Sequence, residues 1–413
     1  MAKGGEAAVA RTLLSSAAVR ERAHEMLGLG VEGALKHWDV RLDRLPDTAA
    51  FVADVVRDRY PTLDVPFHAR WRHFVVDGRD LWVDAAAARS WPDAAAKARS
   101  AFDLAITSVL LDAGSGQGWT YQDAGTGSSS ARSEGLAVAS LRMFQAGAFS
   151  SRSDDLMRAD ASALQRLGGP TLGRGFQVSE TNPLVGVEGR AALLRRLGDA
   201  AASRPDLFGL ADEPRPGGLF DAVAAKARSG KLKAPVILQV LLEALGPIWQ
   251  GRLSLGAVPL GDCWRHPALR RADRTDQLVP LHKLSQWLAY SLVEPLEEAG
   301  IKVTDLDGLT GLAEYRNGGL FIDRGVLALR DPSDAERSWR VEDPLVVGWR
   351  AMTVALLDRL APMVREQLGV AEAAFPLARV LEGGTWAAGR LAAKEQRPGG
   401  VPPLTIVSDG TVF

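Results

Sequence analysis

The sequence predicts a mainly α-helical protein with small β additions, an α+β chain in which helices dominate. Stretches rich in Ala, Leu and Arg recur with helical spacing along most of the 413 residues, whereas the alternation typical of strands is rare. Clusters of Gly, Ser and Pro separate these stretches. No internal repeat of a solenoid type is present.

Each stretch with persistent helical spacing predicts a helix. These stretches are 5–36, 84–113, 133–147, 187–202, 235–250, 276–299, 304–316 and 344–368. Residues 72–84 predict a β-hairpin that turns at Asp77 and Gly78, and 319–329 is a candidate for a second one. Loops are expected at 123–133, 211–218 and 394–403.

The expected helix 276–299 is apolar almost all round, which is typical of a buried helix. Lys283, Gln286 and Tyr290 share one face of it, at i, i+3 and i+7. A buried ammonium is costly without an anion beside it. Lys283 therefore either pairs with an anion or ligand phosphate, or extends its charge to solvent.

The next expected helix, 305–316, carries Glu314. Thr304 with Asp307 resembles a capping box, and Gly318 or Gly319 suits a position after the helix end.

Within that helix Gly311 and Gly318 flank Glu314 at i−3 and i+4, so that its face lacks side chains. A small molecule would then reach the carboxylate, although a surface Glu on an amphipathic helix explains the pattern as well.

Composition and charge bound the function. Lys and Arg total 49 against 50 Asp and Glu, which gives a net charge of -1 and disfavours a nucleic-acid polymer as partner. One cysteine, Cys263, excludes an internal disulfide and a Cys-rich zinc site. No secretion signal or membrane segment is evident, so we expect a cytoplasmic protein. We expect 1–413 to form one composite unit with lobes 1–230 and 231–413.

Other polar clusters have two interpretations each. Asp262 and His266 lie four residues apart and, on one helix face, would hold a metal, but a third ligand is not evident. The alternative that Cys263 and His266 form a nucleophilic pair has no more support than the metal site. The cluster His68 to His73 either contacts phosphate or is partly solvated. The loop 114–118 lacks the ending of a phosphate loop and is expected to be a turn.

Several blocks, taken together, resemble a known family. "SVLLDAGSGQGWTY", "RSEGLAVASLRMFQAGAFS", "NPLVGVEGR", "LGDCWRHP" and "LTGLAEYRNGGLF" occur in this order across nearly the whole chain. They resemble the uracil-catabolism family of fungi and bacteria known as Urc four or uracil-regulated gene three. The resemblance implies a pathway that degrades uracil through its nucleotide, with ring opening by a cyclohydrolase-like partner.

A second, more distant resemblance concerns chemistry. Queuosine salvage proteins, which hydrolyse the N-glycosidic bond of queuosine 5′-phosphate, carry a Lys-x-x-Gln helix followed by Leu-Thr-x-x-Ala-Asp-Tyr-Arg. This chain has Lys283 to Gln286 followed by Leu309 to Arg316, with Glu314 in place of the Asp. The resemblance implies a helical core similar to DNA glycosylases and an N-ribosyl hydrolase activity.

On this interpretation Glu314 stabilises positive charge on the ribose and orients water. Lys283, Arg316 and Arg132 are candidates for the 5′-phosphate and the leaving nitrogen. Trp119 and Tyr121 would wall a pocket with Asp112 on its polar side.

We therefore expect Glu314, Lys283 and Asp112 to be catalytic and a larger set to bind substrate. The latter comprises Trp119, Tyr121, Arg132, Glu134, Asp262, His266, His282, Gln286, Tyr290, Tyr315, Arg316 and Asn317. Ser133 and Glu134 also fit a helix start. No cofactor or metal is expected, and the partner is a small nucleotide or ribosyl phosphate; the oligomeric state stays open. The alternatives are a metal-dependent amidohydrolase acting on a ureido intermediate and a non-catalytic nucleotide-binding or scaffold protein.

Overall fold

The computed structural model describes residues 2–116, 118–209 and 213–407, and these fall into two compact units. The described part of the first unit comprises 2–68, 252–286 and 305–407, and that of the second comprises 69–251 and 287–304 with the same gaps. These two units differ in their residues from the lobes 1–230 and 231–413 that we expected from the sequence. Gln117 in the loop 114–118 and residues 211–212 of the loop 211–218 lie outside the described residues.

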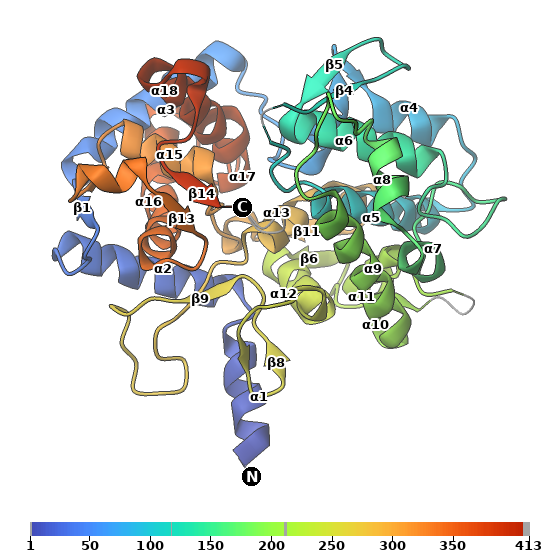
Figure 1. Cartoon of the computed structure of the whole chain (residues 1–413), viewed down its shortest axis with the longest axis horizontal. Coiled ribbons are helices and arrows are strands. Elements are labelled where there is room, and N and C mark those ends of the chain that lie inside the picture. Colours follow the sequence, from blue (N-terminus) through green and yellow to red (C-terminus); the bar gives the residue numbers. More distant parts are fainter. Residues whose placement is uncertain (1, 117, 210–212, 408–413) are drawn as a thin grey trace. The chain divides into compact units, whose positions relative to one another are not determined.

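The first unit is built around the long helix α16, which packs against α2 and α3, while α15 packs against α18 (Figure 1). Its helices are α1 (Ala2–Thr12), α2 (Ser16–Val31), α3 (Leu45–Arg59), α15 (Tyr315–Asp323), α16 (Pro344–Leu368), α17 (Leu377–Arg379), a π-helix η7 (Val380–Thr385) and α18 (Trp386–Gln396). Short 3-10 helices are η1 (Leu42–Arg44), η5 (Leu306–Gly308), η6 (Pro332–Glu336) and η8 (Pro398–Gly400). Between Pro344 and Leu357, α16 is buried almost throughout.

The strands of the first unit form two-stranded sheets, some between neighbouring segments and some between segments far apart in the chain. The pairs are β1 (Trp38–Val40) with β12 (Leu327–Leu329), β7 (Ser254–Leu255) with β8 (Val258–Pro259), β9 (Cys263–Arg265) with β10 (Leu278–Pro280), all antiparallel, and β13 (Ser338–Arg340) parallel to β14 (Thr405–Val407). Residues separated by almost 300 positions therefore share one sheet.

The second unit is also mainly helical. Its helices are α4 (Leu81–Ala87), α5 (Ala94–Leu110), α6 (Arg132–Gln145), α7 (Ala161–Gln165), α8 (Gly169–Gly175), α9 (Val187–Ser203), α10 (Pro205–Phe208), α11 (Leu219–Ala224), α12 (Ala234–Leu245), α14 (Val293–Glu298) and the 3-10 helices η2 (Arg70–Phe74), η3 (Pro216–Gly218) and η4 (Gly246–Ile248). Its strand pairs are β2 (Val75–Val76) with β3 (Arg79–Asp80), β4 (Thr120–Gln122) with β5 (Ser129–Ala131), and β6 (Lys231–Lys233) with β11 (Lys302–Thr304). Helix α13 (Lys283–Ser291) starts in the first unit and ends in the second.

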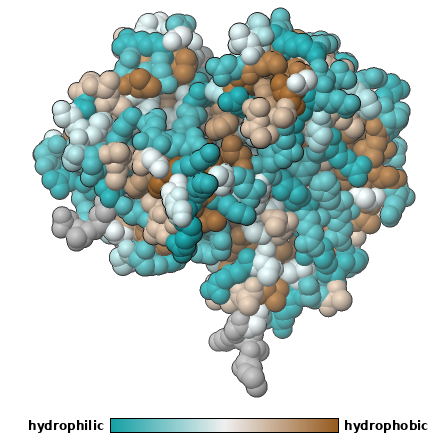
Figure 2. All heavy atoms as spheres, turned by 180° about the vertical axis from the view of Figure 1, so that it is seen from behind, coloured by the Kyte–Doolittle hydropathy of each residue, from teal (hydrophilic) through white to brown (hydrophobic). Residues whose placement is uncertain are grey.

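The mainly α class with small β additions is confirmed, and so is the hairpin turn at Asp77 and Gly78, both of which have positive φ. Hydrophilic and hydrophobic residues are interspersed on the face seen in Figure 2. The exposed large apolar side chains come from many different elements, an ordinary feature of protein surfaces. Within the described residues, no helix combines the length and hydropathy needed to span a membrane.

The expected helices 305–316 and 276–299 are wrong in detail. The helix expected at 305–316 is replaced by η5, a segment without regular secondary structure at 309–313, and α15, which begins at Tyr315. Gly318 and Gly319 lie inside α15 and do not follow a helix end. The helix expected from 276 begins at Lys283, because 278–280 pair with β9.

The second hairpin expected at 319–329 is also absent from the described structure. Residues up to Asp323 continue α15, and 327–329 pair with β1 from the start of the chain. The apolar residues 327–329 thus do form a strand, but its partner strand lies almost 300 residues earlier in the chain.

Candidate active site

Glu314 is the N-cap of α15, and its carboxylate accepts two backbone hydrogen bonds. Oε2 accepts from the Arg316 N–H at 2.7 Å, and Oε1 accepts from the Asn317 N–H at 2.5 Å. Burial raises the pKa of Glu314, against the opposing effects of these N–H groups and of the Lys283 and Arg316 charges. The half-buried Glu314 carboxylate is therefore fixed at the positive end of α15, where it also interacts electrostatically with the Lys283 ammonium.

Lys283 lies at the start of α13 and is half-buried. Its backbone N–H donates to Asp262 Oδ2 at 2.9 Å, so that Asp262 caps this helix from the loop before β9. His282, directly before Lys283, has a φ of 48°, and its N–H donates to the Asp262 carbonyl. These two hydrogen bonds to Asp262 thus fix the backbone at the first residue of α13, from which the Lys283 side chain extends.

Asp262 is a fully occupied acceptor. Its two oxygens accept from Arg350 at 2.9 and 2.8 Å, from Trp264 Nε1 at 2.6 Å, and from the Lys283 N–H. Burial would raise the pKa of Asp262, but Arg350 and the other donors hold that pKa well below its usual range. Since a carboxylate offers about four lone-pair sites, Asp262 has none left for a substrate or a metal.

Gln286 connects α13 to the segment 309–313 before Glu314. Its amide Nε2 donates to Thr310 Oγ1 at 2.5 Å, and its Oε1 accepts from the Thr310 N–H at 3.1 Å. The Gln of the Lys-x-x-Gln helix and the Thr of the Leu-Thr-x-x-Ala segment are thus direct partners. This contact explains why the two motifs occur together.

The three residues that follow Glu314 have mainly structural partners. Arg316 is buried, stacks on the Tyr315 ring at 4.7 Å and donates to the Gly400 carbonyl at 3.1 Å. Asn317 Nδ2 donates to the Leu312 carbonyl at 3.3 Å, whereas its buried Oδ1 has no hydrogen-bond partner within the part of the chain that the structure describes. The Arg316 guanidinium is therefore already engaged within the protein.

The glycines around Glu314 serve packing and leave no bare face. A Cβ on Gly311 would lie 2.5 Å from Leu357, and one on Gly318 would lie 2.7 Å from Trp349. Trp349 Nε1 donates to the Gly318 carbonyl at 3.0 Å. The expectation that these glycines expose Glu314 to a ligand is therefore wrong, because α16 occupies that space.

The candidate metal ligands Asp262 and His266 do not lie on a helix. Asp262 to His266 span strand β9, so the expected common helix face is wrong. Burial lowers the pKa of His266 to about 4 and also lowers that of His282, while burial raises the pKa of the Cys263 thiol. No group of three or more His, Cys, Asp or Glu side chains suited to a metal occurs among the described residues.

Asp112 belongs to the second unit, where it pairs with a fully buried arginine. Arg70 Nη1 donates to its Oδ1 at 2.7 Å, and Ser133 Oγ donates to its Oδ2 at 3.0 Å. Arg132 is exposed with a φ of 56°, and Glu134 lies in the first turn of α6. Asp112, Ser133 and Glu134 thus gather at the start of α6, around Arg70.

The expected aromatic residues are core residues of the second unit. Trp119 is buried against Phe176, whose carbonyl accepts from its Nε1 at 2.9 Å. Tyr121 and Tyr290 are buried as well.

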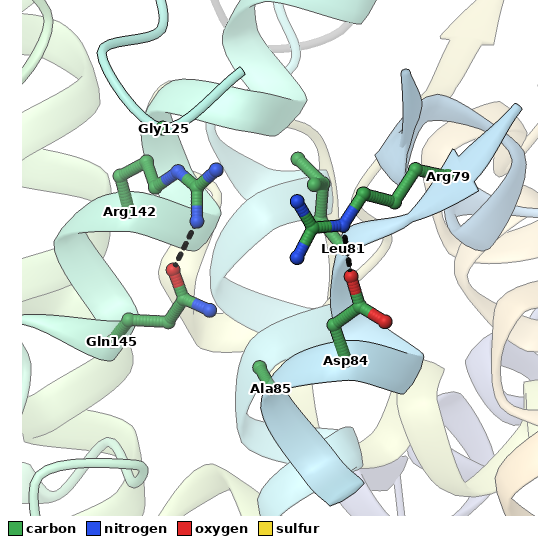
Figure 3. A pocket seen from close by; sticks show the side chains of 7 residues that line it. All are labelled: Arg79, Leu81, Asp84, Ala85, Gly125, Arg142 and Gln145. Carbon is green, nitrogen blue, oxygen red and sulfur yellow. Dashed lines mark hydrogen bonds and ion pairs between the residues drawn. The ribbon is translucent and has the colours of Figure 1, made fainter. Parts of the chain in front are cut away.

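A separate pocket of about 320 Å³ lies in the second unit and is shown in Figure 3. Two arginines face it, but Arg79 pairs with Asp84, and Arg142 pairs with Asp123 and with Gln145. Its cations are therefore already compensated. None of the site residues expected from the sequence lines it.

Two residues of the first-unit site were not expected from the sequence, Arg350 and Thr310. Arg350 had a visible signal, because it is the only charged residue between Pro344 and Leu357. A guanidinium in an apolar helix requires a buried carboxylate partner. Thr310 had no signal beyond its place in the resemblance.

Comparison with known proteins places the chain in a family. Residues 12–413 match the family described as "Protein of unknown function (DUF1688)", and the chain belongs to it. "Protein urg3" of Schizosaccharomyces pombe is 40% identical over 412 residues, covering 97% of this chain and 98% of that protein. "Uracil catabolism protein 4" of Lachancea kluyveri is 37% identical over 416 residues, covering 92% of this chain and 93% of that protein. The expected membership in the uracil-catabolism family is confirmed.

Proposed function

We propose that this protein is an N-ribosyl hydrolase of uracil catabolism that acts on a ring-opened uracil nucleotide of the ribosylurea 5-phosphate type. Water adds to C1′, the bond from C1′ to the ureido nitrogen breaks, and that nitrogen takes up a proton. The products are urea and ribose 5-phosphate. The pathway assignment is supported by the name of the Lachancea kluyveri relative.

The observation that carries the proposal is the carboxylate of Glu314, held by two N–H groups and influenced by the Lys283 charge. Breaking a ribosyl C–N bond builds positive charge on the sugar, which a fixed anion stabilises without reorganising. Each carboxylate oxygen keeps a lone pair after accepting its backbone N–H, which suffices to orient the attacking water.

Lys283 has the complementary role. Its ammonium binds the 5′-phosphate or donates to the leaving ureido group, and its helix start is fixed by Asp262. The residues that hold this arrangement, Gln286 and Thr310, have their hydrogen bonds within the protein and do not take part in the chemistry.

The test is a direct assay of urea and ribose 5-phosphate released from synthetic ribosylurea 5-phosphate. Equimolar release, unaffected by a strong chelator, supports the hydrolase. Loss of turnover with chelator, restored by one divalent ion, would support the metal-dependent amidohydrolase instead. Binding of the compound without turnover would indicate a nucleotide-binding or scaffold protein.

A further inference from the structure

Arg350 is a fully buried cation that connects two segments of the candidate site. It lies in the apolar part of α16, and its side chain is 1% exposed. Its Nε donates to the Ala313 carbonyl at 3.2 Å, and its two terminal nitrogens donate to both oxygens of Asp262.

The two ends of this connection lie next to the two candidate catalytic residues. Ala313 directly precedes Glu314, so the bond to its carbonyl fixes the peptide from which the Glu314 side chain leaves. Asp262 accepts the N–H of Lys283, the first residue of α13. One guanidinium and one carboxylate therefore span the distance between Glu314 and Lys283.

We propose that Arg350 and Asp262 are positioning residues that hold the Glu314 carboxylate and the Lys283 ammonium at their working separation. This inference rests on the proposed function for its kinetic consequence. Neither residue touches the substrate: every acceptor site of Asp262 is occupied, and Arg350 uses Nε and both terminal nitrogens within the protein.

A buried ion pair is weak evidence of a stabilising role, since apolar replacements are often neutral. The chain offers a comparison. Arg215 and Asp103 form another buried pair, in the second unit, and Asp103 also accepts from the Gly217 N–H. That pair contacts none of the candidate catalytic residues. Loss of either pair should disturb folding, but only loss of the Arg350 pair should disturb Glu314.

The disturbance has a defined direction. Burial raises the pKa of Glu314, and the charges of Lys283 and Arg316 oppose that rise. If the pair loosens, Lys283 moves relative to Glu314 and its opposing effect weakens. The carboxyl should then titrate at higher pH, and the misaligned site should lose turnover more than substrate binding.

The experiment compares Arg350→Lys with Arg215→Lys. Titration of ¹³C-labelled Glu side chains by NMR, with Glu314 assigned through Glu314→Gln, should show the Glu314 midpoint higher by about half a pH unit or more in Arg350→Lys and unchanged in Arg215→Lys. On ribosylurea 5-phosphate, kcat should fall roughly 10- to 100-fold in Arg350→Lys, with KM within about threefold. Asp262→Asn, which keeps the shape of the side chain but removes the anion, should lower kcat to a similar extent and serves as the kinetic test if Arg350→Lys does not fold.

An unchanged Glu314 midpoint in folded Arg350→Lys, or an unchanged kcat in folded Asp262→Asn, overturns the positioning role. Equal shifts in the Arg215→Lys control would overturn it too. If the wild-type protein does not release urea, the proposed function fails by itself, and the Glu314 titration still decides whether the pair positions these residues.

Discussion

Glu314 has to be judged as a helix cap and as a catalytic group at once. Asp, Asn, Ser and Thr are the preferred N-cap residues, and Glu is an uncommon choice because its side chain is longer by one methylene. Here that length lets the two oxygens accept from two different N–H groups. The cap alone explains why the side chain is ordered, so only a variant that separates charge from shape can test catalysis.

Glu314→Gln is such a variant. It removes the anion and should lower kcat by about 10²- to 10³-fold with KM little changed, as expected for one preorganised electrostatic contact. It should also lower stability by about 1–3 kcal/mol, since the new NH₂ group meets a backbone N–H. Glu314→Asp, which keeps the charge with a shorter reach, should retain partial activity.

The control is Asp93→Asn at the N-cap of α5, where the carboxylate accepts from the Ala96 N–H at 2.6 Å. It loses a cap anion that belongs to the second unit and takes no part in the hydrogen bonds that hold Glu314, so it should leave kcat unchanged. Turnover of folded Glu314→Gln within about twofold of wild type would leave Glu314 as a helix cap only.

The pH profile follows from the same residue. The working form of Glu314 is the anion, and burial raises its pKa, so kcat/KM should fall as pH decreases through a value above the ordinary 4.3 or so of glutamate. Burial lowers the pKa of His266 to about 4, so that its imidazole is mainly neutral above about pH 5. The measurement is kcat/KM from about pH 4 to pH 8. A flat profile down to the ordinary glutamate value would contradict the assignment.

At the scale of elements, the start of α15 was the feature that sequence reasoning placed least well. Gly311, Gly318 and Gly319 suggested a helix end and an open face, whereas Gly311 and Gly318 allow the segment before α15 and α15 itself to approach α16. The motif was recognised, but its geometry was not, because Gly signals a close approach without indicating what approaches.

Gly318→Ala tests this packing. The added methyl group would meet Trp349 at 2.7 Å and Thr353 at 2.9 Å, so we expect a loss of about 1–3 kcal/mol in unfolding free energy. Gly28→Ala in α2 is the matched control, because a Cβ there has no neighbour within 4 Å. It should gain about 0.5–1 kcal/mol. Equal stability of the two variants by chemical denaturation would show that α15 and α16 can separate at little cost.

At the scale of the molecule, the sequence predicted features that depend on neighbouring residues, but it did not predict contacts between residues far apart in the chain. Helix α16 and the turn at Asp77 and Gly78 were predicted because their patterns depend on neighbours in the chain. The pairing of β1 with β12 was not, since period-2 patterning does not name a partner. Likewise Glu314 and Lys283 were proposed from local motifs, whereas the ion pair between Arg350 and Asp262, which are 88 positions apart, has no local pattern that links its two members.

The same long-range organisation predicts how the chain responds to division. A cut between residues 230 and 231 would separate α2 and α3 from α16, break the pairing of β1 with β12 and remove the Arg20 to Asp358 ion pair at 2.8 Å. Residues 231–413 alone would expose the buried face of α16, which favours aggregation. We therefore expect each fragment alone to be insoluble or to lack a cooperative thermal transition, and the two fragments to copurify when they are coexpressed. Circular dichroism and size-exclusion chromatography provide the measurement. A soluble fragment 231–413 that unfolds cooperatively by itself would contradict this, because it would show that α16 needs neither α2 nor α3 to complete its core.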